Sequence, residues 1–209
     1  MTERVKRPLA ACLCCLLALA TLVSLTYGEG SLGRLDARIL TRLYGYRHTA
    51  AESIAHLFYD LASPLPQMVL LALACAIALR RGLPARAIAA ALLVLGANLT
   101  SQLFKLLLSH PRYQPLLGSW QINPASFPSG HSTAAIAMTF AYLLVSPPGW
   151  RRWLLLLGGV SSLAVGCSVV ALHYHYPSDV VGGWLVAAAW FFAIVACLRA
   201  FPGPTSARA

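Results

Sequence analysis

The sequence predicts an all-α protein: a polytopic bundle of six transmembrane helices in a single domain, residues 1–209, with short interfacial helices between the first two spans. The chain is 58% hydrophobic and only 11% charged, whereas soluble domains of this size carry about a quarter charged residues. Cations outnumber acids by 16 to 6, as is typical of membrane proteins whose cytoplasmic loops collect lysine and arginine. This composition excludes disorder, a nucleic-acid-binding domain and most soluble enzymes.

Six apolar segments approach the roughly 20 residues that a membrane-spanning helix needs. They are residues 8–27, 65–79, 85–103, 133–145, 153–172 and 180–198. The second and fourth are short, so we expect them to extend into their flanks. The first follows Arg4, Lys6 and Arg7 and could be read as a signal peptide. Its apolar core is long for a cleaved signal and no clean cleavage site ends it, so we interpret it as a retained span.

Loop charges predict the orientation of the bundle. If the N-terminus is inside and six helices alternate, ten of the 16 cations fall on the inner side and six on the outer side. This bias predicts an inner (plasma) membrane protein with both termini in the cytoplasm. The histidines then lie on the outer side or near it, which places any chemistry they perform outside the cytoplasm.

Residues 28–63 form a polar stretch between the first two spans. Within it, Leu35, Ile39 and Leu43 recur at helical spacing, as do apolar residues between 54 and 61. We expect one or two amphipathic helices lying along the membrane interface. Such a segment can be a solvated cap over the bundle or a substrate gate.

Three clusters of polar residues border the later spans, where ionisable groups are expensive and therefore candidates for function. In the first cluster, Lys105 ends the third span and Arg112 follows seven residues later. Two such cations can clamp a phosphate, lysine as a point charge and arginine as a planar fork. Snorkelling to lipid headgroups is the alternative reading of this pair.

The second cluster, Ser126-Phe-Pro-Ser-Gly-His-Ser132, precedes the fourth span. A helix start presents free N–H groups and a positive dipole end, which bind phosphate readily. Gly130 permits close backbone approach, Ser129 adds a hydroxyl and His131 supplies a proton that titrates near neutral pH. An ordinary serine-capped helix start is the structural alternative.

The third cluster, His173-Tyr-His-Tyr-Pro-Ser-Asp179, joins the last two spans. Asp179 follows His175 by four residues, so its carboxylate can bind one imidazole nitrogen and leave the other as a nucleophile or base. The pair can also simply staple the loop. No metal-ligand spacing is present, so neither a metal nor another cofactor is expected. Together the clusters suit phosphoryl transfer through a phosphohistidine, stabilised by a cationic cradle.

The three clusters, in this order, resemble the type 2 phosphatidic acid phosphatase superfamily, which also includes vanadium-dependent haloperoxidases. Its signature is Lys-x6-Arg-Pro, Pro-Ser-Gly-His and Ser-Arg-x5-His-x3-Asp. The matching residues here are Lys105, Arg112, Pro128, Ser129, Gly130, His131, Ser168, His175 and Asp179, so the motif core spans residues 105–179. The resemblance implies that His175 attacks phosphorus, Asp179 orients it and His131 protonates the leaving group. It also implies that Lys105, Arg112, Ser129 and the Gly130 backbone hold the phosphoryl oxygens, without a metal.

Two positions depart from this signature. Tyr113 stands where the family has proline, and Val169 stands where the third motif has arginine. Loss of one charge-assisted hydrogen bond, about 1.5–3 kcal/mol, would slow catalysis about ten- to a hundredfold. His173 or His110 is a candidate to compensate. The departure also gives weight to phosphoryl transfer onto an acceptor other than water.

The sequence therefore predicts a membrane lipid phosphatase. The expected substrate is a phosphomonoester or diphosphate of a lipid in the bilayer, such as a polyprenyl diphosphate, phosphatidate or phosphatidylglycerophosphate. Two alternatives stay open: a lipid phosphotransferase of the same superfamily, and a non-catalytic membrane protein that binds anionic lipid.

Overall fold

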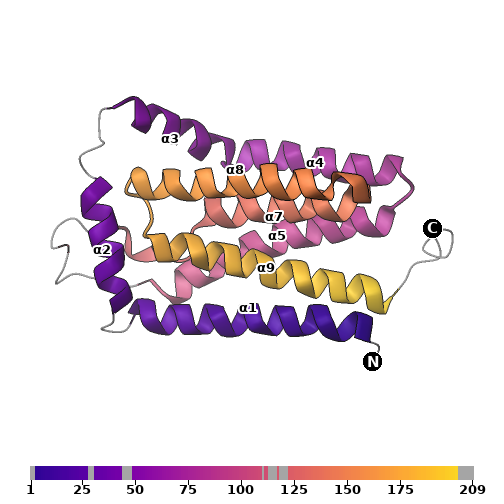
Figure 1. Ribbon diagram of the computed structural model, residues 1–209, viewed down its shortest axis with the longest axis horizontal. Helices are drawn as coiled ribbons and strands as arrows, with labels where there is room; N and C mark the ends of the chain where they lie inside the picture. Colours follow the sequence, from indigo (N-terminus) through magenta and orange to yellow (C-terminus); the bar gives the residue numbers. More distant parts are fainter. Residues whose placement is uncertain are drawn as a thin grey trace.

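The computed structural model describes residues 3–27, 31–43, 49–109, 111–112, 117 and 122–201; within these residues it is helical and contains no strand (Figure 1). The helices are α1 Glu3–Tyr27, α2 Ser31–Leu43, α3 Ala50–Leu61, α4 Pro64–Arg80, α5 Pro84–Leu107, α7 Gly130–Val145, α8 Arg151–Ala171 and α9 Pro177–Ala200, with short 3₁₀ turns η2 Pro124–Ser126 and η3 Pro148–Trp150. Prolines Pro64, Pro84 and Pro177 begin three of the helices, because the first turn needs no donor from that residue. The all-α prediction is confirmed.

The long helices α1, α4, α5, α7, α8 and α9 run along the bundle, and α2 lies across one of its ends (Figure 1). Helix α7 is central and contacts α4, α5, α8 and α9, while α1 packs along α9. Helix α1 begins and α9 ends at the end of the bundle opposite α2 (Figure 1). The end beneath α2 therefore collects the C-terminal ends of α5 and α8 and the N-terminal ends of α7 and α9.

Each of the six predicted spans coincides with one helix, but fewer have the length to cross a membrane. Four segments are long and apolar enough: Glu3–Tyr27, Pro84–Leu107, Pro148–Ala171 and Pro177–Ala200. Helices α3 and α4 pass the same test as a pair bent by 49°, which raises the number to five. The central helix α7 has 16 residues and extends its predicted span only at the N-terminal side. These spans make the chain a multi-pass membrane protein.

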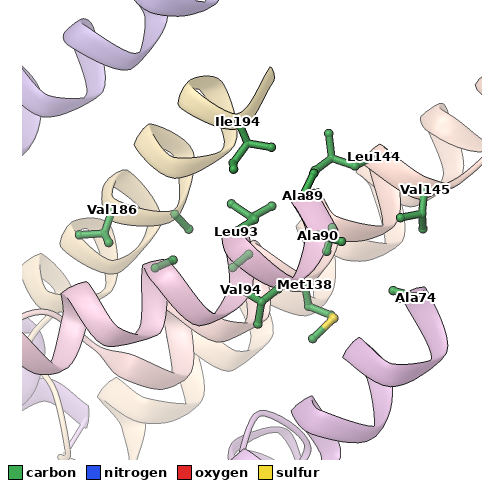
Figure 2. Close-up of a cluster of buried hydrophobic side chains, with 14 of the residues drawn as sticks. Ala74, Ala89, Ala90, Leu93, Val94, Met138, Leu144, Val145, Val186 and Ile194 are labelled. Atoms are coloured by element: carbon green, nitrogen blue, oxygen red, sulfur yellow. The ribbon is translucent and has the colours of Figure 1, made fainter. Parts of the chain in front are cut away.

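The helices pack through small residues. Ala74, Ala90, Ala97, Ala137 and Ala187 are all fully buried, and larger core side chains such as Leu93 and Val145 fill the space between them (Figure 2). Leucines dominate the outer surface instead, and Leu99 and Leu106 are more than 70% exposed. Lipid is as apolar as leucine, so close backbone approach through alanine drives helix association here.

The segment 28–63 contains two helices, α2 and α3, as one of the two predicted outcomes. Of the apolar residues chosen from their spacing, Ile39 and Leu43 are partly buried against the bundle, whereas Leu35, Ile54 and Leu57 are at least half exposed. Helix α2 buries Asp36, Ala37 and Leu40 more completely. Spacing therefore identified the helices and part of the buried face of α2. It did not show that Asp36 is buried, because a helix at a membrane interface has apolar neighbours on both sides.

Candidate functional site

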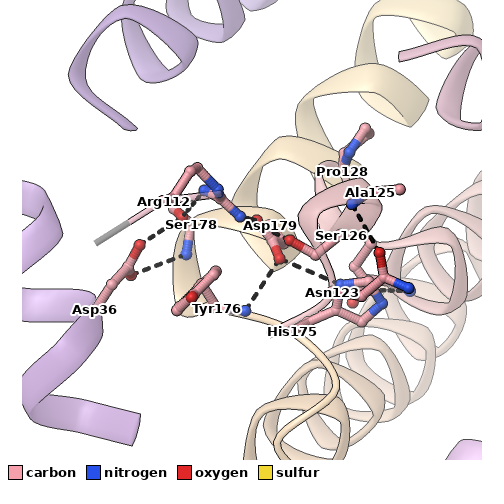
Figure 3. Close-up of polar contacts among 12 residues, drawn as sticks. Asp36, Arg112, Asn123, Ala125, Ser126, Pro128, His175, Tyr176, Ser178 and Asp179 are labelled. Carbon is pink, nitrogen blue, oxygen red and sulfur yellow. Dashed lines mark hydrogen bonds and ion pairs between the residues drawn. The ribbon is translucent and has the colours of Figure 1, made fainter. Parts of the chain in front are cut away.

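The histidine and aspartate of the third cluster are bonded to each other at the start of α9. His175 Nδ1 lies 3.2 Å from Asp179 Oδ2, which also accepts a hydrogen bond of 3.0 Å from the backbone N–H of Tyr176 (Figure 3). Asp179 is fully buried and His175 is 7% exposed. If Nδ1 donates to the carboxylate, Nε2 of His175 keeps its lone pair, as a nucleophile requires.

Arg112 is buried against Asp179. Its Nη2 donates to Asp179 Oδ1 at 2.5 Å and to Ser126 Oγ at 2.8 Å, and its Nη1 donates to Ser178 Oγ at 3.4 Å (Figure 3). The guanidinium also lies over the rings of Tyr176, Tyr27 and Phe127, with its Cζ 4.6, 5.1 and 5.8 Å from their centroids. These contacts hold Arg112 as a buried partner of the carboxylate that orients His175.

The second cluster forms the predicted helix start. Ser129 is the N-cap of α7 and its hydroxyl accepts from the backbone N–H of Ser132 at 3.3 Å. The backbone N–H of Ser129 donates to the carbonyl of Asp179 at 2.9 Å, which ties the start of α7 to the start of α9. A Cβ added at Gly130 would lie 3.6 Å from Lys105 Nζ, so the lysine ammonium sits beside this helix start. The geometry joins a cation and a helix N-terminus, the two elements of an anion site.

His131 is the second residue of α7, ahead of the apolar run 133–145. Its ring stacks on Tyr59 of α3, with centroids 4.0 Å apart. Burial lowers the pKa of His131 to about 4, the charges of His175 and Lys105 act in the same direction, and Asp60 opposes them. An imidazole with such a pKa is neutral at pH 7, and a bound phosphate dianion would raise its pKa again.

The structure therefore places all seven sequence-predicted site residues at one end of the bundle, beneath α2. The list is Lys105, Arg112, Ser129, Gly130, His131, His175 and Asp179. Arg112 and Asp179 are bonded, Ser129 reaches Asp179 through its backbone, and Lys105 and His175 are near enough to His131 to affect its pKa. Within the described part of the chain, no group of three His, Cys, Asp or Glu residues is placed to hold a metal.

Val169, at the family's arginine position, is fully buried in an apolar cluster with Ala37 and Leu40 of α2 and with Tyr176. His173, one candidate for compensation, directs its ring nitrogens at two backbone carbonyls, Ala171 O at 2.9 Å and Leu40 O at 3.2 Å. The other candidate, His110, and the second departure, Tyr113, lie outside the described residues.

Sequence reasoning missed Asp36 and Ser178. Asp36 of α2 is 1% exposed, and its carboxylate accepts from the Ser178 hydroxyl at 2.6 Å and from the Ser178 backbone N–H at 3.2 Å (Figure 3). Asp36 sits between apolar neighbours on a predicted interfacial helix, which was a usable signal. Its partner is 142 positions away in the chain, so spacing did not reveal the contact. Tyr59 was missed for the same reason.

The fold agrees with the comparison to known proteins. The sequence model of the PAP2 superfamily matches residues 86–202, more than half of the chain. The chain belongs to the PAP2 superfamily, and the resemblance drawn from the three clusters is confirmed.

Two curated relatives are named as phosphatases. Undecaprenyl-diphosphatase from Sulfolobus acidocaldarius is 36% identical over 61 residues, which are 29% of this chain and 28% of the relative. Phosphatidylglycerophosphatase B from Bacillus subtilis is 32% identical over 90 residues, 40% of this chain and 43% of the relative. The matches thus span less than half the length of either relative.

The fold also has a solved counterpart. The crystal structure of a transmembrane PAP2 type phosphatidylglycerolphosphate phosphatase from Bacillus subtilis superimposes with a TM-score of 0.73 at 21% sequence identity. The superposition covers 88% of this chain and 94% of that one. The two chains share the same helical architecture.

Proposed function

We propose that the protein is a lipid phosphatase that hydrolyses a phosphomonoester or diphosphate of a lipid at the outer face of the inner membrane. The observation that carries the proposal is the His175–Asp179 pair, held by Arg112 and tied to the start of α7 beside Lys105. The names of the two curated relatives support a lipid phosphate as the substrate. Polyprenyl diphosphate, phosphatidate and phosphatidylglycerophosphate are the candidate substrates.

The proposed reaction has two steps. Nε2 of His175 attacks phosphorus, the N–P bond forms and the bond to the leaving oxygen breaks, while His131 gives that oxygen a proton. A water molecule then attacks the phosphohistidine, His131 takes the water proton, and phosphate leaves with His175 restored. Asp179 keeps the His175 ring oriented in both steps, and Arg112 holds Asp179.

The anion cradle of the proposal consists of Lys105, Ser129 and the Gly130 backbone. Arg112 donates to Asp179, Ser126 and Ser178, so in the proposal it acts on the reaction through Asp179. In the proposal, the phosphate dianion raises the pKa of His131 from its low value, so that His131 binds the proton it later donates. Lysine and the N–H groups at the start of α7 stabilise the charge that builds up on the phosphoryl oxygens.

The test is phosphate release from each of the three lipid phosphates by the purified protein in detergent. We expect turnover that vanadate inhibits and that persists in EDTA. The variant His175→Ala should lower this turnover at least a thousandfold. His56→Ala, on the exposed face of α3, is the control and should keep native turnover. Full activity of His175→Ala would exclude the phosphohistidine, and a protein that only binds anionic lipid would show no vanadate-sensitive turnover.

A lipid phosphotransferase is the second candidate, favoured by the buried Val169 at the arginine position. It needs an acceptor, so labelled lipid phosphate should release no free phosphate until a lipid or sugar alcohol is added. Release of free phosphate without an added acceptor would show that the protein is a hydrolase rather than a phosphotransferase.

A further inference from the structure

Asp36 is a buried carboxylate that none of the three motifs contains. It belongs to α2, and only 1% of its surface is exposed. A buried carboxylate is costly unless partners satisfy it, and Asp36 accepts hydrogen bonds from the backbone N–H and the hydroxyl of Ser178, the second residue of α9. Asp36 therefore binds the start of the helix that carries Asp179.

The contacts of Ser178 continue to the candidate nucleophile. Arg112 Nη1 donates to the Ser178 hydroxyl, and Arg112 Nη2 donates to Asp179, which in turn faces His175 (Figure 3). All five members of this chain of contacts are less than 10% exposed. Because water does not compete for these groups, the loss of a contact at Asp36 must change the positions or hydrogen bonds of the other residues in this series of contacts.

A second contact holds α2 at the same place. The His173 ring lies 3.2 Å from the Leu40 carbonyl of α2, and Leu40 packs in the apolar cluster that contains Val169 and Tyr176. Helix α2 is thus attached at two points one turn apart: Asp36 binds the start of α9, and the Leu40 carbonyl contacts His173 in the loop between α8 and α9. This arrangement differs from a solvated cap, which would present its acidic residues to water.

We propose that Asp36 is a positioning residue for the reaction: through Ser178 and Arg112 it holds Asp179 in the place where Asp179 orients His175. This inference rests on the proposed function. It assigns part of the machinery to α2, outside the region matched by the family model. Asp36 touches neither substrate nor phosphate in this role, so its loss acts on kcat and leaves substrate binding nearly unchanged.

The experiment compares Asp36→Asn, Ser178→Ala and the double variant with the native protein, using Arg38→Gln as the control on the exposed face of α2. Asparagine keeps the shape of Asp36 but removes its charge and one acceptor. We expect each single variant to lower kcat about ten- to a hundredfold with KM changed by less than about threefold. The double variant should fall no further than the worse single variant, because the two residues act as one unit.

Diethyl pyrocarbonate labelling adds a readout that does not need turnover. The reagent acylates the free imidazole nitrogen, and peptide mass mapping measures the rate at His175. We expect this rate to fall at least threefold in Asp36→Asn and in Ser178→Ala, and to stay native in Arg38→Gln. Thermal unfolding in detergent verifies that each variant is folded at the assay temperature.

The outcomes separate the inference from the proposed function. If Asp36→Asn keeps the native kcat while His175→Ala abolishes turnover, the positioning role is wrong and the proposed function stands. If the native protein shows no turnover on any substrate, the proposed function is wrong. Labelling then tests the inference by itself: equal labelling rates at His175 in the native and Asp36→Asn proteins overturn it. A rise in KM with unchanged kcat also overturns it.

Discussion

Val169 shows how one residue departs from its family and what surrounds it. The side chain is fully buried among Ala37, Leu40, Leu117, Ile122, Val170, Tyr176 and Val180, and its carbonyl accepts the backbone N–H groups of Tyr174 and His175. The motif spacing identifies Val169 as the position where the family has arginine, but only the structure shows that apolar side chains surround it. The arginine position has become part of the packing beneath α2.

Restoring the family's arginine should therefore destabilise the protein. Val169→Arg buries a guanidinium in an apolar cluster, which costs on the order of several kcal/mol when no acid pairs with it. We expect the unfolding temperature in detergent to fall by about 10 °C and phosphate release to fall with it. Val169→Met, which is long but uncharged, is the control and should lose less than half as much. An arginine variant with native stability and increased turnover would contradict this view of the site.

At the scale of elements, the candidate site depends on how closely α9 approaches the start of α7. A Cβ at Gly183 would lie 2.7 Å from the Ser129 carbonyl and 2.8 Å from Thr133 Oγ1. Both atoms belong to the turn and helix start that form the proposed cradle. Glycine is needed at this position because any side chain would push the two helix starts apart.

Gly183→Ala should separate these elements. Overpacking of this kind costs about 1–3 kcal/mol, and the backbone bond from Ser129 to Asp179 should lengthen. We expect at least a tenfold loss of phosphate release together with a lower unfolding temperature. The matched control is Gly159→Ala in α8, where a Cβ meets nothing within 4 Å and should stabilise the helix by about 0.5–1 kcal/mol. Equal behaviour of the two variants would show that the approach of α9 is unimportant.

At the scale of the whole molecule, more of the described cations lie at the end where α1 begins and α9 ends than at the end beneath α2. Arg4, Arg7 and Arg199 line a hollow of about 530 Å³ with Glu3, where α1 begins and α9 ends. Arg81 and Arg86 donate to the carbonyls of Val145 and Leu144, at the junction of α4, α5 and α7. The candidate site lies at the other end, beneath α2. This unequal distribution supports the proposed orientation, with the end richer in cations in the cytoplasm and the site outside.

Reporter fusions test that orientation and the number of spans together. With six spans and a cytoplasmic N-terminus, alkaline phosphatase fused after Ser63 should be active, and fusions after Pro147 or at the C-terminus should be inactive. A green fluorescent protein at the C-terminus should fluoresce. An active C-terminal alkaline phosphatase would indicate an odd number of spans, as in the five that length and composition allow, or the opposite orientation.

The sequence by itself determined the helical fold class, the position of each long helix and the family. Apolar runs and motif spacing are local properties, and a residue such as Asp179 is recognisable from the His175 four positions before it. Only the tertiary structure decided that Arg112 binds Asp179, and that Asp36 is buried and reaches Ser178. The two bonded pairs are 67 and 142 positions apart in the chain, and the partner of a buried charge at such a distance depends on how helices pack rather than on any pattern within one of them.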